Sequence, residues 1–419
     1  MSSFSTGPLA GAMIRWGAIG AALSGCGGSG GGPQVDQTPP TVQIVVPVGG
    51  LRAGPGLPIE VQVSAHDASG IGEVVLQASG GMTWQSSQLQ AGGPIDATPT
   101  FGFTVPSATP AGPTVTLVAK GVDLHGNIGM AAQVTLTVDP AILIAVPAGL
   151  TAEPFAPAAA GFLGSATAVA VSPRDGSLYV ADNSAGAPCN GRCIRKIDAG
   201  SGTAAAAAVV NGVGVIEGLA FDASGDNLYY SDRQSRLLRL TWNAVSGAYE
   251  TPTICNDPVA GDPVDPYHLV SDASLGLLVV DGSSQRVVRQ ATCSGTAPSA
   301  FSATLAQPGG IALGPAGEVF VADGSAGTIV QVDRTTGALA PFQQTGLGAP
   351  RGIVWLGGAS SWAGSLLVAD AGLDQVLAVN GTSAAPVAYL AVVPVDVAVA
   401  GSFVYVLTSS AGLFRIGGF

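Results

Sequence analysis

"QPGGIALGPAGEVFVADGSAGTIVQVDRTTG" (307–337) contains the pattern that decides the fold of most of this 419-residue chain. An apolar run at 310–314 precedes a Gly turn, a second run that ends in Asp323, a small polar loop and an alternating run. Alternation of apolar and polar residues between Gly-containing turns predicts short, half-buried β-strands. The same order of features recurs at 176–202, 226–247 and 364–381.

The repeat has a period that is typical of a β-propeller. Aligning the second apolar run of each copy marks six positions at intervals of 38 to 50 residues: Leu178, Leu228, Leu277, Val319, Leu366 and Val404. Units of this length with about four strands each are the blades of propellers, whereas parallel solenoids have shorter repeats. Residues 140–419 are therefore predicted to form a six-bladed β-propeller.

A propeller ring has to close, because an open ring exposes two unpaired sheet edges. The last copy ends in "LFRIGGF" (413–419), which provides a third strand and no fourth. The segment "ILIAVPAGLTA" (142–152) precedes the first copy and is expected to supply the missing strand. The first and last segments would then share one blade.

The stretch 307–337 resembles an NHL repeat, whose pattern runs Pro-x-Gly-Ile-Ala, a Gly turn, Val-Tyr-Val-Ala-Asp and a further strand. The resemblance is best in the copies around Asp182, Asp323 and Asp370, and the last copy has Thr408 where the Asp is expected. It implies the fold of an NHL-like propeller. It names no function, because propellers serve for binding, scaffolding and catalysis alike.

The recurrent aspartates are predicted to be structural. Each stands where a strand leaves its sheet, and a carboxylate there accepts hydrogen bonds from loop N–H groups. Architecture repeats one residue in every unit, whereas catalysis would mark a single blade. This group comprises Asp182, Asp232, Asp281, Asp323 and Asp370.

Residues 39–139 form a separate β-rich unit of about seven alternating runs, which is typical of a β-sandwich. The segments "HDASGIGEV" (66–74) and "AKGVDLHGN" (119–127) resemble bacterial Ig-like modules of extracellular proteins, which implies a spacer or adhesive role. Their polar residues either bond their own turns or hold Ca²⁺, and both readings stay open. These residues are Asp67, Asp123 and Asn127.

The N-terminus reads as a targeting segment. Residues 1–25 resemble a bacterial lipoprotein signal peptide, in which "LSGC" places Cys26 at the lipidated position. The alternative is a stray Cys after an ordinary signal, and the chain starts at Met1 or Met13. Residues 26–38 are a Gly-rich tether, and no later run reaches the roughly 20 apolar residues of a membrane span. The resemblance implies an exported protein held at the bacterial cell envelope by acyl chains. The Gly27 that follows favours the outer membrane.

The remaining cysteines predict two disulfides. Four are left once Cys26 is set aside, and an even count in an exported protein favours disulfides. "CNGRC" (189–193) brackets a tight turn, so we expect a Cys189–Cys193 bond and a Cys255–Cys293 bond. Zinc is the rival reading, but no His lies near the Cys-x₃-Cys pair.

Charge excludes one class of partner. The chain has 15 basic and 27 acidic residues, a formal charge of −12, and only 10% charged residues. Phosphate binding needs clustered Lys and Arg, and no such cluster occurs. We therefore expect no nucleic-acid partner.

Candidate site residues are those that break the repeat. The two residues at the start of each inner strand should converge on the mouth of the central channel. Four of these positions are ionisable in a chain with few charged residues: Glu217, His268, Arg351 and Asp396. Tyr267 directly precedes His268 and belongs to the same strand start. They are either the polar lining of a wet channel or a ligand or metal site.

One resemblance tests the metal reading. "IEGLAFDASGDNLYYSD" (216–232) resembles the opening blade of the regucalcin/gluconolactonase family, which are six-bladed, metal-dependent lactonases. It implies that Glu217 is a metal ligand and that Asp396 substitutes for another, with a divalent ion such as Ca²⁺ as Lewis acid. The Asn that the family places at a later inner strand is absent, and Arg351 would repel a cation.

Two functions follow. The preferred one is a binding or scaffold protein without a cofactor, which recognises a protein or carbohydrate at the envelope through the face that holds Glu217, Tyr267, His268, Arg351 and Asp396. The alternative is a lactonase-like hydrolase that uses the same mouth. Neither His-Glu-x-x-His nor a phosphate loop occurs in the sequence.

Overall fold

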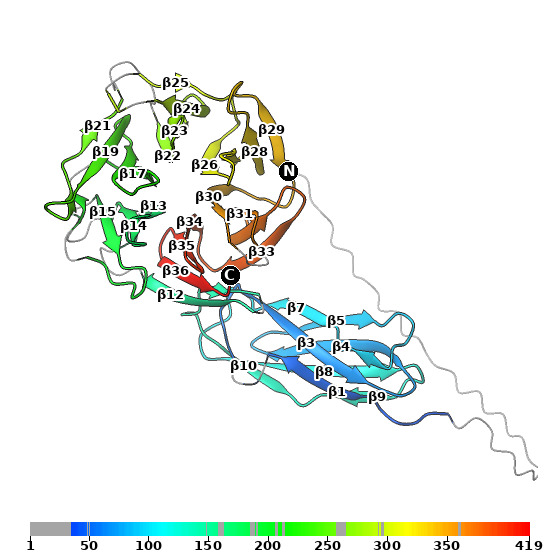
Figure 1. Cartoon of the computed structure of the whole chain (residues 1–419). Coiled ribbons are helices and arrows are strands. Elements are labelled where there is room, and N and C mark those ends of the chain that lie inside the picture. The colour runs from blue at the N-terminus through cyan, green and yellow to red at the C-terminus, as the bar shows by residue number, and fades with distance from the viewer. Residues whose placement is uncertain are drawn as a thin grey trace, which may run out of the picture.

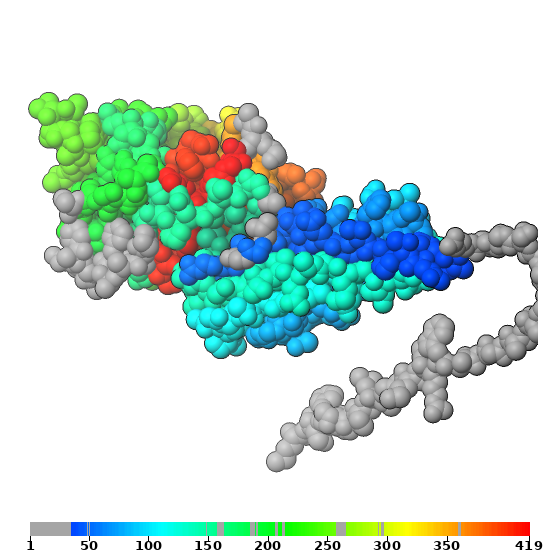
Figure 2. All heavy atoms as spheres, turned by 90° about the horizontal axis from the view of Figure 1, so that it is seen from below, coloured from blue at the N-terminus to red at the C-terminus, as the bar shows by residue number. Residues whose placement is uncertain are grey.

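The computed structural model describes residues 35–419, except 48, 50, 148, 158–162, 185–188, 190–191, 206–207, 212–213, 257–264, 292, 295–296 and 359–361. Throughout this part of the chain the regular elements are β-strands, which confirms the all-β prediction. A ring of sheets is joined at its edge to an elongated N-terminal unit (Figure 1, Figure 2). Cys26 and the predicted signal peptide lie outside the described residues. None of the described segments is a helix of the length and apolarity that a bilayer crossing requires.

The N-terminal unit consists of two sheets that share one hydrophobic core. In one sheet, β1 (Thr41–Val46), β3 (Pro58–His66) and β6 (Asp96–Ala97) lie side by side, and β7 (Thr100–Thr104) also pairs with β3. The other sheet has the order β2 (Arg52–Ala53), β10 (Val134–Val138), β8 (Thr114–Asp123), β4 (Ile71–Gly80) and β5 (Trp84–Leu89), with β9 (Ile128–Met130) beside β8.

The polar turns of this unit are bonded internally. The Asp67 Oδ1 accepts hydrogen bonds from the Ser69 amide at 2.8 Å and the Ser69 hydroxyl at 2.7 Å. The Asp123 carboxylate accepts the Asn127 amide at 2.8 Å on one oxygen and the Asn127 side-chain amide at 2.7 Å on the other. Ligand atoms of Asp36, Asp123 and His125 lie within 4.8 Å of one another, but both Asp123 oxygens already serve the turn.

Sheets of four or five strands follow one another around the ring, which confirms the predicted propeller fold. Each sheet begins on an inner strand, and each inner strand contacts the next, with the last against the first (Figure 1). The six inner strands are β13 (Ala166–Val171), β17 (Ile216–Phe221), β22 (Pro266–Asp272), β26 (Pro308–Leu313), β30 (Pro350–Leu356) and β34 (Pro394–Ala400).

Second and third strands follow outward in each sheet, and their apolar side chains pack between neighbouring sheets. The second strands end in the recurrent aspartates or, in the last sheet, in Thr408; they are β14 (Leu178–Asp182), β18 (Asn227–Asp232), β23 (Gly276–Asp281), β27 (Val319–Asp323), β31 (Ser365–Asp370) and β35 (Phe403–Thr408). The third strands are β15 (Cys193–Ile197), β19 (Arg236–Asn243), β24 (Arg286–Gln290), β28 (Thr328–Val332), β32 (Gln375–Val379) and β36 (Gly412–Gly417).

The outer strands are less regular, as expected at the wet edge of a blade. They are β16 (Val210–Asn211), β20 (Ala248–Tyr249) with β21 (Thr253–Ile254), β25 (Ser299–Ala300), β29 (Leu339–Gln343) and β33 (Ala384–Leu390). The last sheet takes its outer strand from the N-terminal side of the ring: β12 (Thr151–Pro157) pairs antiparallel with β36. The first and last segments therefore do share one sheet.

The prediction that residues 142–152 form this closing strand was wrong in its bounds. Within 142–152, β11 (Ile144–Ala145) pairs with β33 of the neighbouring sheet, and most of the closing strand lies beyond residue 152. The cause is a turn, because the Leu150 amide bonds the Pro147 carbonyl and Gly149 adopts a φ of 91°. The predicted single strand is thus cut into two that serve different sheets.

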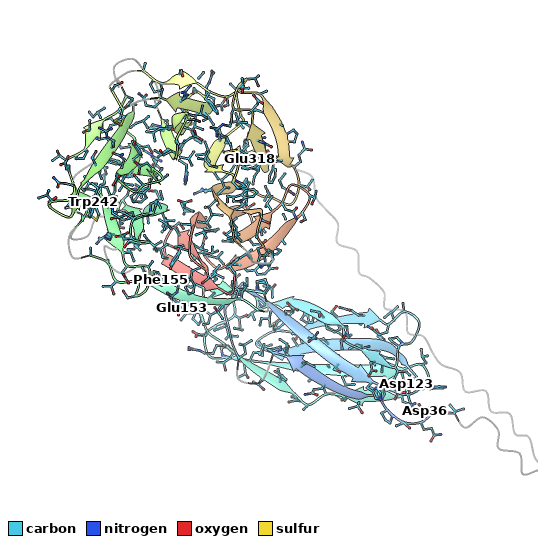
Figure 3. The ribbon with its side chains drawn as sticks, viewed as in Figure 1. Asp36, Asp123, Glu153, Phe155, Trp242 and Glu318 are labelled. Carbon is cyan, nitrogen blue, oxygen red and sulfur yellow. A yellow bond between two sulfur atoms is a disulfide. The ribbon has the colours of Figure 1, made fainter. Side chains whose placement is uncertain are left out.

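Side chains reinforce the closure. The Arg415 guanidinium of β36 donates to Glu153 of β12 at 2.9 Å and lies 4.6 Å from the centre of the Phe155 ring. The rings of Phe155 and Tyr405 meet edge-on at 5.1 Å, and Figure 3 labels Glu153 and Phe155 at this seam. A charge pair and an aromatic cluster therefore join the two ends of the ring.

The structural role predicted for the recurrent aspartates is confirmed. Asp323 accepts the amides of Ala306 at 2.7 Å and Gln307 at 2.9 Å, which tie the start of β26 to the end of β27. Asp370 binds the start of β30 in the same way, through the amides of Gly348 and Ala349. Asp182, Asp232 and Asp281 likewise accept loop amides, and in the last sheet the Thr408 hydroxyl accepts the Ala411 amide.

Both predicted disulfides are confirmed. Cys189 bonds to Cys193 and Cys255 bonds to Cys293. The first joins the loop after β14 to the start of β15, and the second ties residues after β21 to residues after β24, which lie in adjacent sheets.

Candidate functional site

A cavity of about 930 Å³ lies where the inner strands begin, and all six inner strands contribute to its wall. The rest of the wall comes from loops that follow the second strands, and these loops contribute Asn183, Arg233, Gly282 and Gly324. The cavity therefore occupies one end of the ring axis.

Every inner strand has a register irregularity where it begins, and this irregularity places the side chains of the cavity. In β17, for example, Ile216 pairs with Asp232 and Gly218 pairs with Ser231, so Glu217 has no partner in the ladder. A bulged residue is turned out of the regular alternation. The residues skipped in this way and found in the wall are Thr167, Glu217, Tyr267, His268, Gly309, Arg351 and Val395.

Glycine within or directly after the bulge lets adjacent inner strands approach each other. A Cβ at Gly218 would lie 2.3 Å from the Tyr267 carbonyl oxygen, and one at Gly310 would lie 2.1 Å from the Arg351 carbonyl oxygen. Neither gap admits a side chain. Glycine at these two positions therefore permits the close approach of β17 to β22 and of β26 to β30.

The buried aspartates fix the cavity wall. Ala306 and Gln307, whose amides Asp323 accepts, line the cavity, and so does Ala349, whose amide Asp370 accepts. The repeated carboxylates are therefore architectural, yet they hold the loops that shape the site.

Glu217 and Arg233 form an ion pair inside the cavity, with the Arg233 Nε 2.5 Å from the Glu217 Oε1. Burial raises the pKa of the Glu217 carboxyl, and the Arg233 charge opposes that rise. Sequence reasoning missed Arg233. The signal was its position directly after Asp232, because Asn183, Gly282 and Gly324 also follow a recurrent Asp and line the cavity.

Tyr267 and His268 form the neighbouring part of the wall. The Tyr267 carbonyl accepts the Ser231 hydroxyl at 2.6 Å, and burial, followed by a hydrogen bond with Asp265, raises the pKa of its phenol. His268 is half-buried, and its charge would lower the pKa of both Glu217 and Asp396.

Arg351 stands apart from the acids of the site. Arg351 is exposed at the cavity wall, and it forms no ion pair with any of the described residues. The sheet between Arg351 and His268 contributes Gly309 and Gly324, which have no side chains.

Asp396 does not face the cavity, contrary to expectation. The bulged residue of β34 is Val395, so Asp396 returns to the ladder and points toward the first inner strand. Its carboxylate accepts the amides of Val169 and Val397, each at 2.9 Å. Burial raises its pKa, although the His268 charge and these amides act against the rise. Asp396 thus joins the last inner strand to the first.

The predicted metal pair is not brought together in the cavity. Glu217 is bonded to Arg233, and Asp396 uses its oxygens on backbone amides. Among the described residues, groups of three or more possible metal ligands occur at Asp36, Asp123 and His125, and at Asp182, Cys189 and Cys193, and none of these lines the cavity.

Known proteins offer similarity of structure only. No protein-family model matches the sequence, and no curated protein matches it. A structural genomics protein of unknown function from Bacteroides thetaiotaomicron is similar at 12% identity with a TM-score of 0.49, over 91% of this chain and 98% of that one.

Two enzymes are similar over smaller parts of the chain. A gluconolactonase from Xanthomonas campestris matches at 14% identity and a TM-score of 0.47, over 60% of this chain and 86% of its own. The virginiamycin B lyase from Staphylococcus aureus matches at 15% and 0.43, over 73% and 91%. At this distance the likenesses say nothing about what the chain binds.

Proposed function

We propose that this protein is an exported bacterial lipoprotein that binds a polar ligand in the axial cavity without transforming it. In this proposal an Ig-like sandwich carries a six-bladed, NHL-like propeller, and acyl chains on Cys26 hold the protein in the cell envelope, with the outer membrane preferred. The partner is a carbohydrate or a protein segment, and the membrane is contacted through the anchor alone.

The arrangement of the chain supports the anchoring part. Asp36, the second of the described residues, lies at the end of the N-terminal unit that faces away from the ring, beside Asp123 (Figure 3). A tether from Cys26 would enter there, so the N-terminal unit would act as a spacer. The propeller would then stand away from the membrane with its cavity free.

The observation that carries the binding function is the cavity itself. Its volume of about 930 Å³ lies within the range of small-molecule sites. All six inner strands present a bulged position to it, which is how a fold aims side chains at a site. Glu217 and Arg233 are paired, whereas His268, Gln307, Ser325 and Arg351 offer hydrogen-bonding groups along one side.

The hydrolase alternative is less well supported. A metal-dependent lactonase needs free carboxylates around its cation, and both predicted ligands are engaged elsewhere. Calorimetric titration with Ca²⁺, Zn²⁺ and Mn²⁺ separates the two functions. We expect no binding tighter than millimolar, and tight binding that Glu217→Ala abolishes would favour the hydrolase.

Binding is tested on the protein purified from envelope membranes, with an array of defined envelope oligosaccharides and peptides. A Cβ at Gly309 meets no atom closer than 3.5 Å, so Gly309→Trp should fill the cavity without disturbing the wall. We expect Gly309→Trp to abolish binding and Gly357→Trp, a control in open space, to preserve it. No binding to any array member, or equal binding by both variants, would refute the proposal.

A further inference from the structure

We infer that the ligand of the axial cavity carries a carboxylate, which is seated between Arg351 and His268 above Gly309 and Gly324. This inference rests on the proposed function and narrows the chemical class of its ligand. It depends on the distribution of charge around the cavity wall and on the absence of side chains at one part of it.

The charges in the wall do not cancel. Among the described residues that line it, carboxylate, guanidinium and imidazole groups belong to four: Glu217, Arg233, His268 and Arg351. Glu217 and Arg233 neutralise each other through their ion pair. The Arg351 guanidinium remains, so the other side of the cavity carries a positive charge in a chain whose formal charge is −12, and His268 adds a hydrogen-bonding imidazole to the wall.

The described acids around the starts of these inner strands already have hydrogen-bond partners. Asp323 and Asp370 bind the amides at the starts of β26 and β30, and Asp396 binds the amides of Val169 and Val397. Asp265 is hydrogen-bonded to Tyr267 and does not line the cavity. The described residues therefore supply Arg351 with no internal counter-ion.

A side-chain-free notch lies beside Arg351. The inner strands β22, β26 and β30 are consecutive around the ring, so the wall from β26 separates His268 from Arg351. That wall carries Gly309 and Gly324, at which a Cβ would meet no atom closer than 3.5 Å and 3.4 Å respectively. The space that two side chains would fill is left open.

This combination suits a carboxylate. Guanidinium binds carboxylate through two parallel hydrogen bonds, and a partly enclosed cavity strengthens that attraction. Gln307 and Ser325, which line the same notch, would bond neighbouring hydroxyl or amide groups of the ligand. Thr167 and Asn183 on the opposite side are hydrogen-bonded to each other and to the Ile216 carbonyl, so they have fewer free hydrogen-bonding groups for a ligand.

Trigalacturonate and its full methyl ester test the inference, because they differ only in whether each carboxyl group is a charged carboxylate or a neutral methyl ester. By calorimetry at low salt we expect the acid to bind the envelope-purified protein about tenfold more tightly than the ester. Arg351→Gln should reduce the affinity for the acid about tenfold and leave the affinity for the ester unchanged. Arg192→Gln removes the same charge from an exposed residue outside the cavity and should change neither.

The outcomes separate this inference from the proposed function. Equal binding of acid and ester that Gly309→Trp abolishes would overturn the carboxylate inference and leave the cavity as a ligand site. Failure of the acid to bind, or tighter binding of inorganic phosphate than of the acid, would also overturn it. If no member of the array binds, both the proposed binding function and the carboxylate inference are overturned.

Discussion

Asp272 and Arg334 clasp each other across two neighbouring sheets, with Nη1 2.8 Å from Oδ2 and Nη2 3.0 Å from Oδ1. Asp272 ends β22, and Arg334 follows β28. Burial alone would raise the pKa of Asp272, but hydrogen bonds from Arg334 and Ser274 outweigh it and hold the pKa well below its usual range. This two-pronged pair links adjacent sheets at the ends of the strands that lie away from the cavity.

We expect Arg334→Gln to reduce the free energy of unfolding by about 1–2 kcal/mol at pH 7. Because the folded-state pKa of Asp272 is lowered, its stabilisation is present above the unfolded value of about 3.9 and is lost as the pH falls through the folded value. In urea titrations the difference between wild type and variant should be constant from pH 5 to 7 and shrink below about pH 4. Arg192→Gln is the control, and a difference that grew with acid would contradict the assignment.

The convergence of inner strands gives a prediction about packing. Gly310→Ala places a Cβ 2.1 Å from the Arg351 carbonyl oxygen, where only backbone movement can relieve the clash. We expect a loss of about 3 kcal/mol or more in unfolding free energy. Gly357→Ala, where a Cβ meets nothing within 4 Å, should change stability by less than about 0.5 kcal/mol. Equal thermal midpoints for the two variants would show that the strands do not meet as described.

The sequence made the repeat, the clamping aspartates and both disulfides predictable, because each depends on residue type at a recurring position. Asp323 and Asp370 stand in register with the strands that they terminate, so their role follows from one copy to the next. Thr408 shows that the position matters more than the carboxylate, since a hydroxyl accepts the loop amide there.

The orientation of the site residues was less predictable. A bulge shifts the side-chain alternation by one residue, and the amino-acid sequence of 394–396 does not reveal which residue is left out of the strand pairing. Val395 therefore faces the cavity and Asp396 does not. The Glu217–Arg233 pair was missed for a similar reason: it joins a bulge to a loop, and only the three-dimensional arrangement brings them together.

Asp396 is expected to stabilise the seam between the last and first inner strands. Asp396→Asn keeps one acceptor but turns an amide N–H₂ toward a backbone donor, so we expect a loss of about 1–3 kcal/mol. The folded-state pKa is raised, so the wild-type contribution is greatest below the unfolded value of about 3.9 and falls as the pH rises toward the folded value. The loss measured by urea unfolding should therefore be larger at low pH than at pH 8. Asp374→Asn, at an exposed turn, is the matched control.

Arg233 is expected to keep Glu217 ionised in a wall that disfavours charge. Burial raises the Glu217 pKa and the Arg233 charge limits that rise, so Arg233→Gln should raise the pKa further. A raised carboxyl pKa makes stability fall as the pH increases from the unfolded value of about 4.3 to the folded value, so the variant should lose more stability than wild type over that interval. Carbon-detected NMR titration of the Glu217 carboxyl measures the shift directly. Arg192→Gln should leave the Glu217 titration unchanged, and an unaltered curve in Arg233→Gln would mean that the ion pair does not form in solution.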